Sequence, residues 1–162
     1  RVIGGSALTD PSIPLPEGDL HRVGVPVSYV PFRNAHLLAG CVSWAEVLGA
    51  GHLFVGFVEE DSSGYPDCRE AFLRSFEQTA NLGPKPETRL RLHAPLIHCT
   101  KAQIVARGLE LQAPLHLTWS CYQGEGEACG RCDSCLLRLR GFHEAGHPDP
   151  IPYAFIPDSF RL

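Results

Sequence analysis

The sequence predicts an α/β protein with a parallel sheet, followed by a C-terminal metal-binding lobe. Short apolar runs of strand length alternate with segments of helical periodicity, in the order strand, helix, strand, helix, strand, helix. This alternation is typical of parallel sheets built with right-handed crossovers. Four of the seven cysteines then lie between Cys121 and Cys135. We therefore expect an α/β domain over residues 1–114 and a metal-binding lobe with an extended tail over residues 115–162.

The first strand and the first helix are expected after an opening segment without regular structure. About two dozen residues rich in glycine and proline come first, a composition typical of loops. Val25 to Val30 alternates apolar and small polar residues, which predicts a strand. Asn34 is a good N-cap for a helix that ends at Gly49.

That helix is predicted to bury a broad apolar face, because its apolar residues recur at helical spacing. Cys41 belongs to this face and is expected in the core. The residues of the face are Leu37, Cys41, Trp44 and Leu48, with Leu38, Val42 and Ala45 beside them.

The middle of the chain predicts two strands around a helix. Leu53 to Val58 is a continuous apolar run, as expected for a parallel strand covered on both faces. Asp67 and Glu70 form a capping-box pair ahead of a helix that stops before Gly83. Arg89 to His93 is the next short strand.

A third helix is predicted from a second capping-box pair, Thr100 and Gln103, and is expected to end near Gly108. In the lobe, Asp133 or Ser134 is expected to cap a further helix. The proline-rich tail after it is expected to be an extended arm.

The cysteine spacing predicts a closed tetrahedral site for zinc, made by Cys121, Cys129, Cys132 and Cys135. Four thiolates leave no open position for a substrate, so the zinc should be structural. Disulfides are less favoured, because the count is odd and cysteines three apart make poor partners. An iron–sulfur cluster remains the alternative, although no Cys-Pro ending follows Cys135.

Composition excludes some classes of partner. The net charge of −4 argues against broad binding of nucleic acid. The apolar runs are far short of the ~20 residues that span a bilayer, so we expect no membrane insertion. Free thiolates suit a reducing, cytoplasmic location. A chain that starts at Arg1 and contains no methionine is expected to be one piece of a longer gene product.

Ligands of an open parallel sheet gather beyond the carboxyl ends of its strands, near helix N-termini that favour anions. Arg33 lies between a predicted strand and a predicted helix, where a guanidinium could hold phosphate or carboxylate. Lys101 lies in the first turn of a later helix and could reach a phosphate. The alternative is that both are solvated surface charges. Arg138 and Arg140 on the last helix could likewise be solvated, or could contact a nucleotide.

A second loop, residues 61–69, combines an aromatic ring, an acid and a base. Tyr65 could stack on a purine-like ring and Asp67 could accept from its amino–imino edge. The alternative is that Asp67 only caps its helix while Tyr65 packs the turn. Cys68 lies beside them, and only the helix start favours a reactive thiolate there.

Several segments together resemble the 7-cyano-7-deazaguanine synthases of the queuosine and deazaguanine pathway. The resemblance covers nearly the whole chain. The segments that carry it are Gly4-Gly5-Ser6-Ala7-Leu8-Thr9-Asp10, Tyr29-Val30-Pro31-Phe32-Arg33-Asn34, Ser63-Gly64-Tyr65-Pro66-Asp67-Cys68-Arg69, Pro95-Leu96-Ile97 with Lys101, and Thr118-Trp119-Ser120-Cys121-Tyr122 with the Cys-Gly-Arg-Cys-Asp-Ser-Cys run.

The resemblance implies a Rossmann-like domain of the PP-loop ATP pyrophosphatase type (adenine nucleotide alpha hydrolase type), usually a homodimer, with zinc on the four cysteines. It implies that ATP, with Mg²⁺, activates the carboxylate of 7-carboxy-7-deazaguanine. Ammonia then gives an amide, and a second ATP-driven step gives the nitrile. Arg33 and Lys101 would be the catalytic charge stabilisers. The residues implied to bind the substrate are Asn34, Gly64, Tyr65 and Asp67.

The sequence departs from the family pattern in two features. The Ser-Gly-Gly-x-Asp-Ser phosphate loop is absent, so this piece alone is expected to be inactive. Val58-Glu59 stands where the family tends to have Asn-Ala, which suggests a divergent substrate. Two alternatives therefore stay open: a related PP-loop enzyme that acts on another base or a tRNA, and a non-catalytic zinc-binding paralogue.

Overall fold

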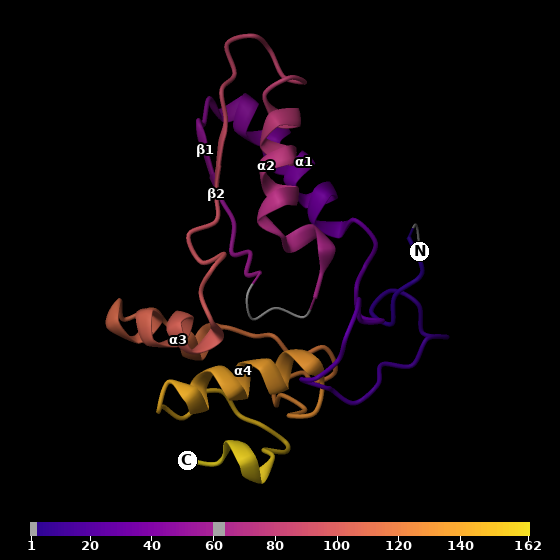
Figure 1. Cartoon of the computed structure of the whole chain (residues 1–162), viewed down its shortest axis with the longest axis vertical. Coiled ribbons are helices and arrows are strands. Elements are labelled where there is room, and N and C mark those ends of the chain that lie inside the picture. The colour runs from indigo at the N-terminus through magenta and orange to yellow at the C-terminus, as the bar shows by residue number, and fades with distance from the viewer. Residues whose placement is uncertain (1–2, 60–63) are drawn as a thin grey trace.

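The computed structural model describes residues 3–59 and 64–162, and it confirms the α/β class. In Figure 1, α1, α2 and the two strands occupy one end of the molecule, while α3 and α4 lie together at the other. The regular elements are α1 (Arg33–Leu48), β1 (His52–Phe54), α2 (Glu70–Ala80), β2 (Arg91–His93), α3 (Lys101–Glu110) and α4 (Asp133–Glu144).

The sheet of the described residues has two parallel strands, with Leu53 opposite Leu92. The helix α2 makes the crossover between them, as the sequence predicts. The apolar run that begins at Leu53 gives a shorter strand than expected, because its pairing with β2 covers only three residues. One further hydrogen bond, from the N–H of Val55 to the carbonyl of His93, extends the pairing.

The predicted strand from Val25 to Val30 is wrong. The N–H of Tyr29 bonds to the carbonyl of Pro26 at 3.0 Å, which closes a turn in the middle of this segment. The side chain of Ser28 is buried. Its apolar and polar alternation therefore reflects a packed turn instead of a strand.

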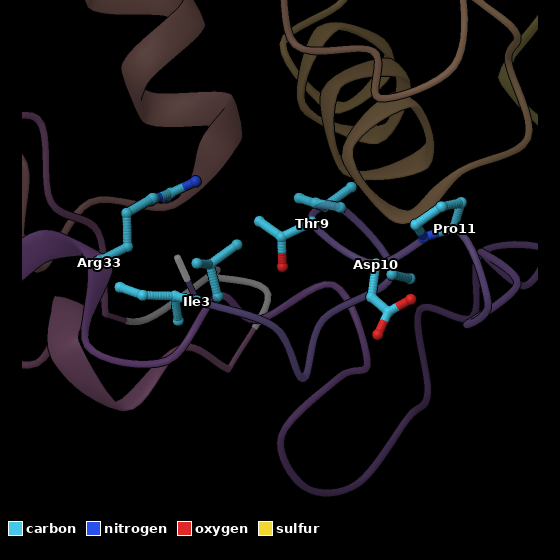
Figure 2. Close-up of a pocket in the computed structure, with 8 residues that line it drawn as sticks. Ile3, Thr9, Asp10, Pro11 and Arg33 are labelled. Atoms are coloured by element: carbon cyan, nitrogen blue, oxygen red, sulfur yellow. The ribbon is translucent and has the colours of Figure 1, made fainter. Parts of the chain in front are cut away.

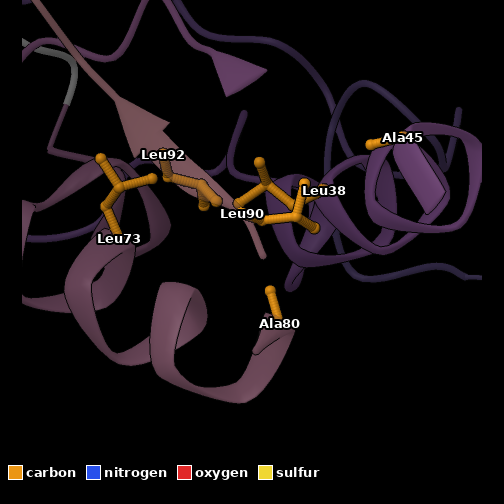
Figure 3. Packing of buried hydrophobic residues seen from close by; sticks show 6 residues of the cluster. All are labelled: Leu38, Ala45, Leu73, Ala80, Leu90 and Leu92. Atoms are coloured by element: carbon orange, nitrogen blue, oxygen red, sulfur yellow. The ribbon is translucent and has the colours of Figure 1, made fainter. Parts of the chain in front are cut away.

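The core of the α/β part lies where α1 and α2 meet the strands, and Figure 3 shows leucines of α1, α2 and β2 meeting there. Burial of such side chains supplies most of the stability of a small domain. The buried residues of this cluster are Leu38, Ala45, Leu73, Ala80, Leu90 and Leu92.

The predicted inner face of α1 is wrong in part. Leu38 and Ala45 are buried, but Leu37, Trp44 and Leu48 are exposed, with Trp44 at 67%. Cys41 is also exposed, which contradicts its expected place in the core. The helix is apolar on two sides, and periodicity alone does not show which side meets the sheet.

Three predicted helix caps are also wrong. Asn34 does not cap α1, whose N-cap is Phe32. Asp67 does not cap α2, whose N-cap is Arg69. Instead Glu59, eleven residues earlier, accepts a hydrogen bond from the N–H of Glu70 at 2.9 Å. In α4 the N-cap is Cys132, and the Asp133 carboxylate accepts from the backbone of the opening segment instead.

The capping box of α3 is confirmed. The hydroxyl of Thr100 accepts from the N–H of Gln103 at 3.2 Å, and the Gln103 side chain accepts from the N–H of Thr100 at 2.9 Å. The helix continues past Gly108 to Glu110, beyond the predicted end.

Replacing Thr100 with alanine should therefore lower the free energy of unfolding by about 1 kcal/mol, the usual cost of losing such a cap. Chemical denaturation measures the change. Thr79→Ala is the control, because its hydroxyl bonds only to a carbonyl within α2. Equal losses in the two variants would contradict the role of the cap.

The tail has no helix or strand element from residue 147 to residue 157, as expected of an extended arm, but it packs against the lobe. Ile151 is buried, and the N–H of Ala128 bonds to the carbonyl of Pro152 at 2.9 Å. Arg138 is held by Asp149 of the tail, so it is neither a solvated charge nor a ligand contact. Among the described residues, no helix has the length and apolar character needed to cross a membrane.

Candidate functional site

A cavity of about 360 Å³ brings together four of the residues predicted to form the site. They come from separate parts of the chain: Arg33 and Asn34 begin α1, Tyr65 precedes a short 3₁₀ turn, and Lys101 begins α3. Cys68 and the segment after β1 complete the lining. Two cations from helix N-termini therefore face one cavity, an arrangement that suits an anionic ligand.

The turn before α1 sets the place of Arg33. Phe32 has a left-handed backbone with φ of 56°, an uncommon conformation for a residue other than glycine. The hydroxyl of Tyr29 accepts a hydrogen bond from the Phe32 N–H at 2.9 Å. This bond fixes the turn from which the helix starts.

Arg33 also borders a second, larger cavity of about 770 Å³. Figure 2 shows Arg33 on one side of this cavity, with Thr9, Asp10 and Pro11 of the opening segment on the other. Arg33 thus lines two ligand-sized spaces, which suits contact with the reacting groups of two substrates.

Lys101 is placed by close contact between α3 and α4. A Cβ atom added at Gly141 of α4 would lie 2.7 Å from the Cβ of Lys101. Only glycine therefore allows α4 to approach the first turn of α3 so closely. The lobe helix sets the position of a residue on the cavity wall.

Tyr65 lines the cavity but is only 7% exposed. Its hydroxyl lies 3.0 Å from the hydroxyl of Ser28 and 3.0 Å from that of Tyr122. The ring of Tyr29 packs beside it, with ring centres 5.7 Å apart. The hydroxyl of Tyr65 is thus used within the protein, and what it offers a ligand is its ring.

Asp67 lies behind the cavity wall and is 3% exposed. Its Oδ2 accepts from the backbone N–H of Asn34 at 2.9 Å, so it caps α1 at the positive end of the helix. Its Oδ1 has no hydrogen-bond partner among the described residues. The side chain of Asn34 in turn donates to the Asp67 carbonyl and to Cys68 Sγ.

Cys68 is not poised as a nucleophile. Burial and the neighbouring Asp67 raise the pKa of its thiol, and the hydrogen bond from Asn34 and the cations of Arg33 and Lys101 offset only part of this effect. The group is therefore a neutral thiol near pH 7.

Gly64 lies apart from the cavity. Its φ of 80° favours glycine, and a Cβ there would lie 3.2 Å from the carbonyl of Gly24. It borders a smaller space of about 190 Å³ beside Arg22 and Asp133. The residues before it in the predicted loop, Asp61 to Ser63, lie outside the described residues.

The four cysteines of the lobe converge as the sequence predicts, and they could bind a metal ion. Their Sγ atoms all lie within 4.8 Å of one another. One pair, Cys129 and Cys135, is 3.9 Å apart. A single tetrahedral ion with metal–sulfur bonds of about 2.3 Å separates its sulfurs by about 3.8 Å, so the spacing fits one ion.

Backbone N–H groups point at these sulfurs, as expected around thiolates. Burial alone raises the pKa of Cys121, but N–H groups of Cys129, Gln123 and Gly124 outweigh it and leave the pKa lowered. The hydrogen bond with Cys135 lowers the pKa of Cys132 to about 4, and the N–H of Tyr122 contributes in the same direction. The pKa of Cys135 is raised by its hydrogen bond with Cys132 and by burial, and burial raises that of Cys129. Without a metal ion, the protons of the cluster therefore stay mainly on Cys129 and Cys135.

The sequence did not indicate the structural roles of Ser28, Tyr122 and Glu59. Ser28 and Tyr122 meet Tyr65 through contacts between distant parts of the chain, which no local pattern records. One weak indication of the role of Tyr122 was present in the sequence, its position directly after the predicted metal ligand Cys121. Glu59 carries the cap of α2, so the acid that departs from the family pattern has a structural role.

Comparison with known proteins gives one family. The family model described as queuosine biosynthesis protein QueC matches residues 1–146. The 7-cyano-7-deazaguanine synthase of Chlorobium phaeobacteroides (strain DSM 266) is 57% identical over 156 residues, covering 96% of this chain and 69% of the relative. The synthase of Chlorobaculum tepidum is 54% identical, and the match covers 99% of this chain and 70% of the relative. The synthase of Acidobacterium capsulatum is 58% identical, and the match covers 95% of this chain and 69% of the relative.

Proposed function

Because the chain belongs to the QueC family of queuosine biosynthesis proteins, we propose that it converts 7-carboxy-7-deazaguanine and ammonia to 7-cyano-7-deazaguanine with ATP. The observation that carries this proposal is the 54–58% identity to named 7-cyano-7-deazaguanine synthases over nearly the whole chain. The shared cavity of Arg33, Asn34, Tyr65 and Lys101 supports it.

In this proposal the two cations act on the reacting groups. ATP, with Mg²⁺, activates the substrate carboxylate, ammonia displaces the activated oxygen to give the amide, and a second ATP-driven dehydration gives the nitrile. Such chemistry mainly needs two anions held together and a stabilised leaving phosphate. Arg33 borders both cavities and would hold the carboxylate against the nucleotide, while Lys101 would stabilise the leaving group.

The base of the substrate would lie in the cavity of about 360 Å³ that Arg33, Tyr65 and Lys101 line. The ring of Tyr65 offers a stacking surface, and the amide of Asn34 lies on the wall. Asp67 lies behind this wall, so it would serve the binding of the base indirectly, by holding Asn34 through the hydrogen bond that Oδ2 accepts from the Asn34 N–H. Gly64 would contribute by allowing the turn that presents Tyr65.

We assign zinc to the cysteine cluster, with a structural role. Four thiolates around one ion are the usual ligands of structural zinc. The alternative, an iron–sulfur cluster, attaches its cysteines to different iron atoms and needs sulfurs further apart than those seen here. The site would tie the lobe together and leaves no ligand position for a substrate.

The finer fold and the assembly belong to the same proposal. The parallel pair β1 and β2, with α2 as its crossover, fits part of a Rossmann-like sheet of the PP-loop type. The exposed apolar residues of α1, Leu37, Trp44 and Leu48, form a surface suited to a homodimer. We place the enzyme in the cytoplasm. Analytical ultracentrifugation of the complete gene product tests the dimer.

The direct test of the function is a reaction. The complete gene product, loaded with zinc, is incubated with ATP, Mg²⁺, ammonia and 7-carboxy-7-deazaguanine, and mass spectrometry follows the amide and the nitrile. We expect both products in sequence, and none without ATP. A folded, zinc-loaded protein that makes neither product would contradict the proposal.

Arg33→Ala should weaken the affinity for 7-carboxy-7-deazaguanine about 10- to 100-fold, because hydrogen bonds to charged groups contribute about 1.5–3 kcal/mol. Isothermal titration calorimetry measures the change. Arg74→Ala is the matched control, since Arg74 is an exposed arginine that pairs with Glu70 on the surface of α2. If both variants bind like the wild type, Arg33 is not a substrate contact.

A further inference from the structure

Three hydroxyl groups form a continuous hydrogen-bonded row between the cavity and the cysteine cluster. Ser28 and Tyr65 are 3.0 Å apart, and Tyr65 and Tyr122 are 3.0 Å apart. Ser28 and Tyr65 are buried, and Tyr122 is partly buried against the cysteine cluster. The row joins the opening segment, the turn before α2 and the metal-binding turn.

The position of Tyr122 is set by the cysteine cluster. Tyr122 directly follows Cys121, and the next two backbone N–H groups, of Gln123 and Gly124, bond to the Cys121 sulfur at 3.4 and 3.1 Å. Binding of a metal by Cys121 therefore holds the whole turn, and with it the hydroxyl of Tyr122.

The position of Tyr65 sets part of the cavity wall. Its carbonyl accepts from the N–H of Cys68 at 3.1 Å, which forms the 3₁₀ turn that carries Asp67. Asp67 in turn caps α1 at Asn34. A shift of Tyr65 would thus reach both the stacking surface and the helix start that presents Arg33.

We propose that Tyr122 is a positioning residue that couples the metal-binding lobe to the substrate cavity. Its hydroxyl holds Tyr65, and the metal-bound turn holds Tyr122. Binding free energies of two coupled sites are reciprocal, so metal in the lobe favours the ligand-ready cavity, and a ligand in the cavity favours metal retention. The ligand part of this inference rests on the proposed function, whereas the positioning part does not.

The test is Tyr122→Phe, which removes one oxygen atom and keeps the ring. Tyr153→Phe is the matched control, because Tyr153 also packs against the cysteine cluster and its hydroxyl also makes a hydrogen bond, to Asp149 at 2.7 Å, away from the cavity. Both variants are prepared with zinc in the complete gene product. Zinc content, amide hydrogen exchange and the Kd for 7-carboxy-7-deazaguanine are measured.

We expect Tyr122→Phe to keep its zinc while the amides of Asn34 and Cys68 exchange faster than in the wild type. The Kd should rise about 2- to 10-fold, the range expected when one ordinary hydrogen bond is lost. Tyr153→Phe should leave both amides and the Kd unchanged. Ser28→Ala, at the other end of the row, should reproduce the faster exchange at Cys68.

Two results would overturn the proposal. One is wild-type exchange at Asn34 and Cys68 in zinc-loaded Tyr122→Phe. The other is loss of zinc from that variant, which would make Tyr122 a part of the metal site alone. Faster exchange together with no binding of the compound, even by the wild type, would support the positioning role and count against the proposed function.

Discussion

Replacing Cys135 with serine is expected to release the metal and unfold the C-terminal lobe. Cys135 is fully buried at the start of α4, and its sulfur lies 3.9 Å from that of Cys129. Structural zinc contributes about 10–16 kcal/mol of apparent binding free energy in zinc-finger peptides. Loss of one ligand should therefore remove several kcal/mol of stability, more than most single substitutions do.

The loss should spread beyond the lobe. The carbonyl of Arg131, inside the metal-binding turn, accepts from the N–H of Gly18 at 2.7 Å, and a Cβ at Gly18 would lie 2.7 Å from the backbone of Asp133. The opening segment is thus tied to the cysteine turn. We expect the opening segment, and the cavity that it borders, to loosen together with the lobe.

Zinc content by plasma mass spectrometry and unfolding by circular dichroism measure this change. Cys41→Ser is the control, because Cys41 is an exposed cysteine on α1. It should keep one zinc per chain and the wild-type Tm. A Cys135→Ser variant with the same zinc content and Tm as this control would contradict the structural role of the cluster.

The second large loss of stability is expected when Asp149 is replaced with alanine. The Asp149 side chain is 2% exposed and accepts from Arg138 through two nitrogens, at 2.6 and 2.8 Å. It also accepts from the hydroxyl of Tyr153. Alanine leaves a buried guanidinium without its charge partner, a change that costs about 3–5 kcal/mol.

Thermal and chemical unfolding of the zinc-loaded protein measure the loss. Asp158→Ala is the matched control, because its pair with Arg161 has a carboxylate that is 91% exposed, and exposed pairs contribute about 0–1 kcal/mol. Comparable losses from the two variants would show that the tail is not held by the Arg138–Asp149 pair.

The parts of the fold that the sequence predicted well are those specified by neighbouring residues. The capping box at Thr100, the helix end at Gly49 and the cysteine spacing all depend on contacts within a few positions, and all are present. The false strand near Ser28 and the wrong face of α1 depend on long-range packing. Alternation and periodicity report which residues are apolar, but not what they pack against.

The candidate site divides in the same way. Lys101 could be predicted because α3 starts after the parallel strand β2, and such helix starts gather at one edge of a sheet. Arg33 was predicted from a strand that is not there, and a turn before α1 places it instead. Tyr122 could not, since its partner is 57 positions away. Asp67 shows the intermediate case: an acidic cap was expected, but the helix that it caps lies 33 positions earlier.

The central claim is that this chain holds one closed, four-thiolate zinc beside the substrate cavity and not within it. X-ray absorption at the zinc edge of the complete gene product tests it directly. We expect four sulfur ligands at about 2.3 Å, with the same spectrum before and after 7-carboxy-7-deazaguanine is added. An oxygen or nitrogen ligand, a change on adding the substrate, or iron in place of zinc would contradict the claim.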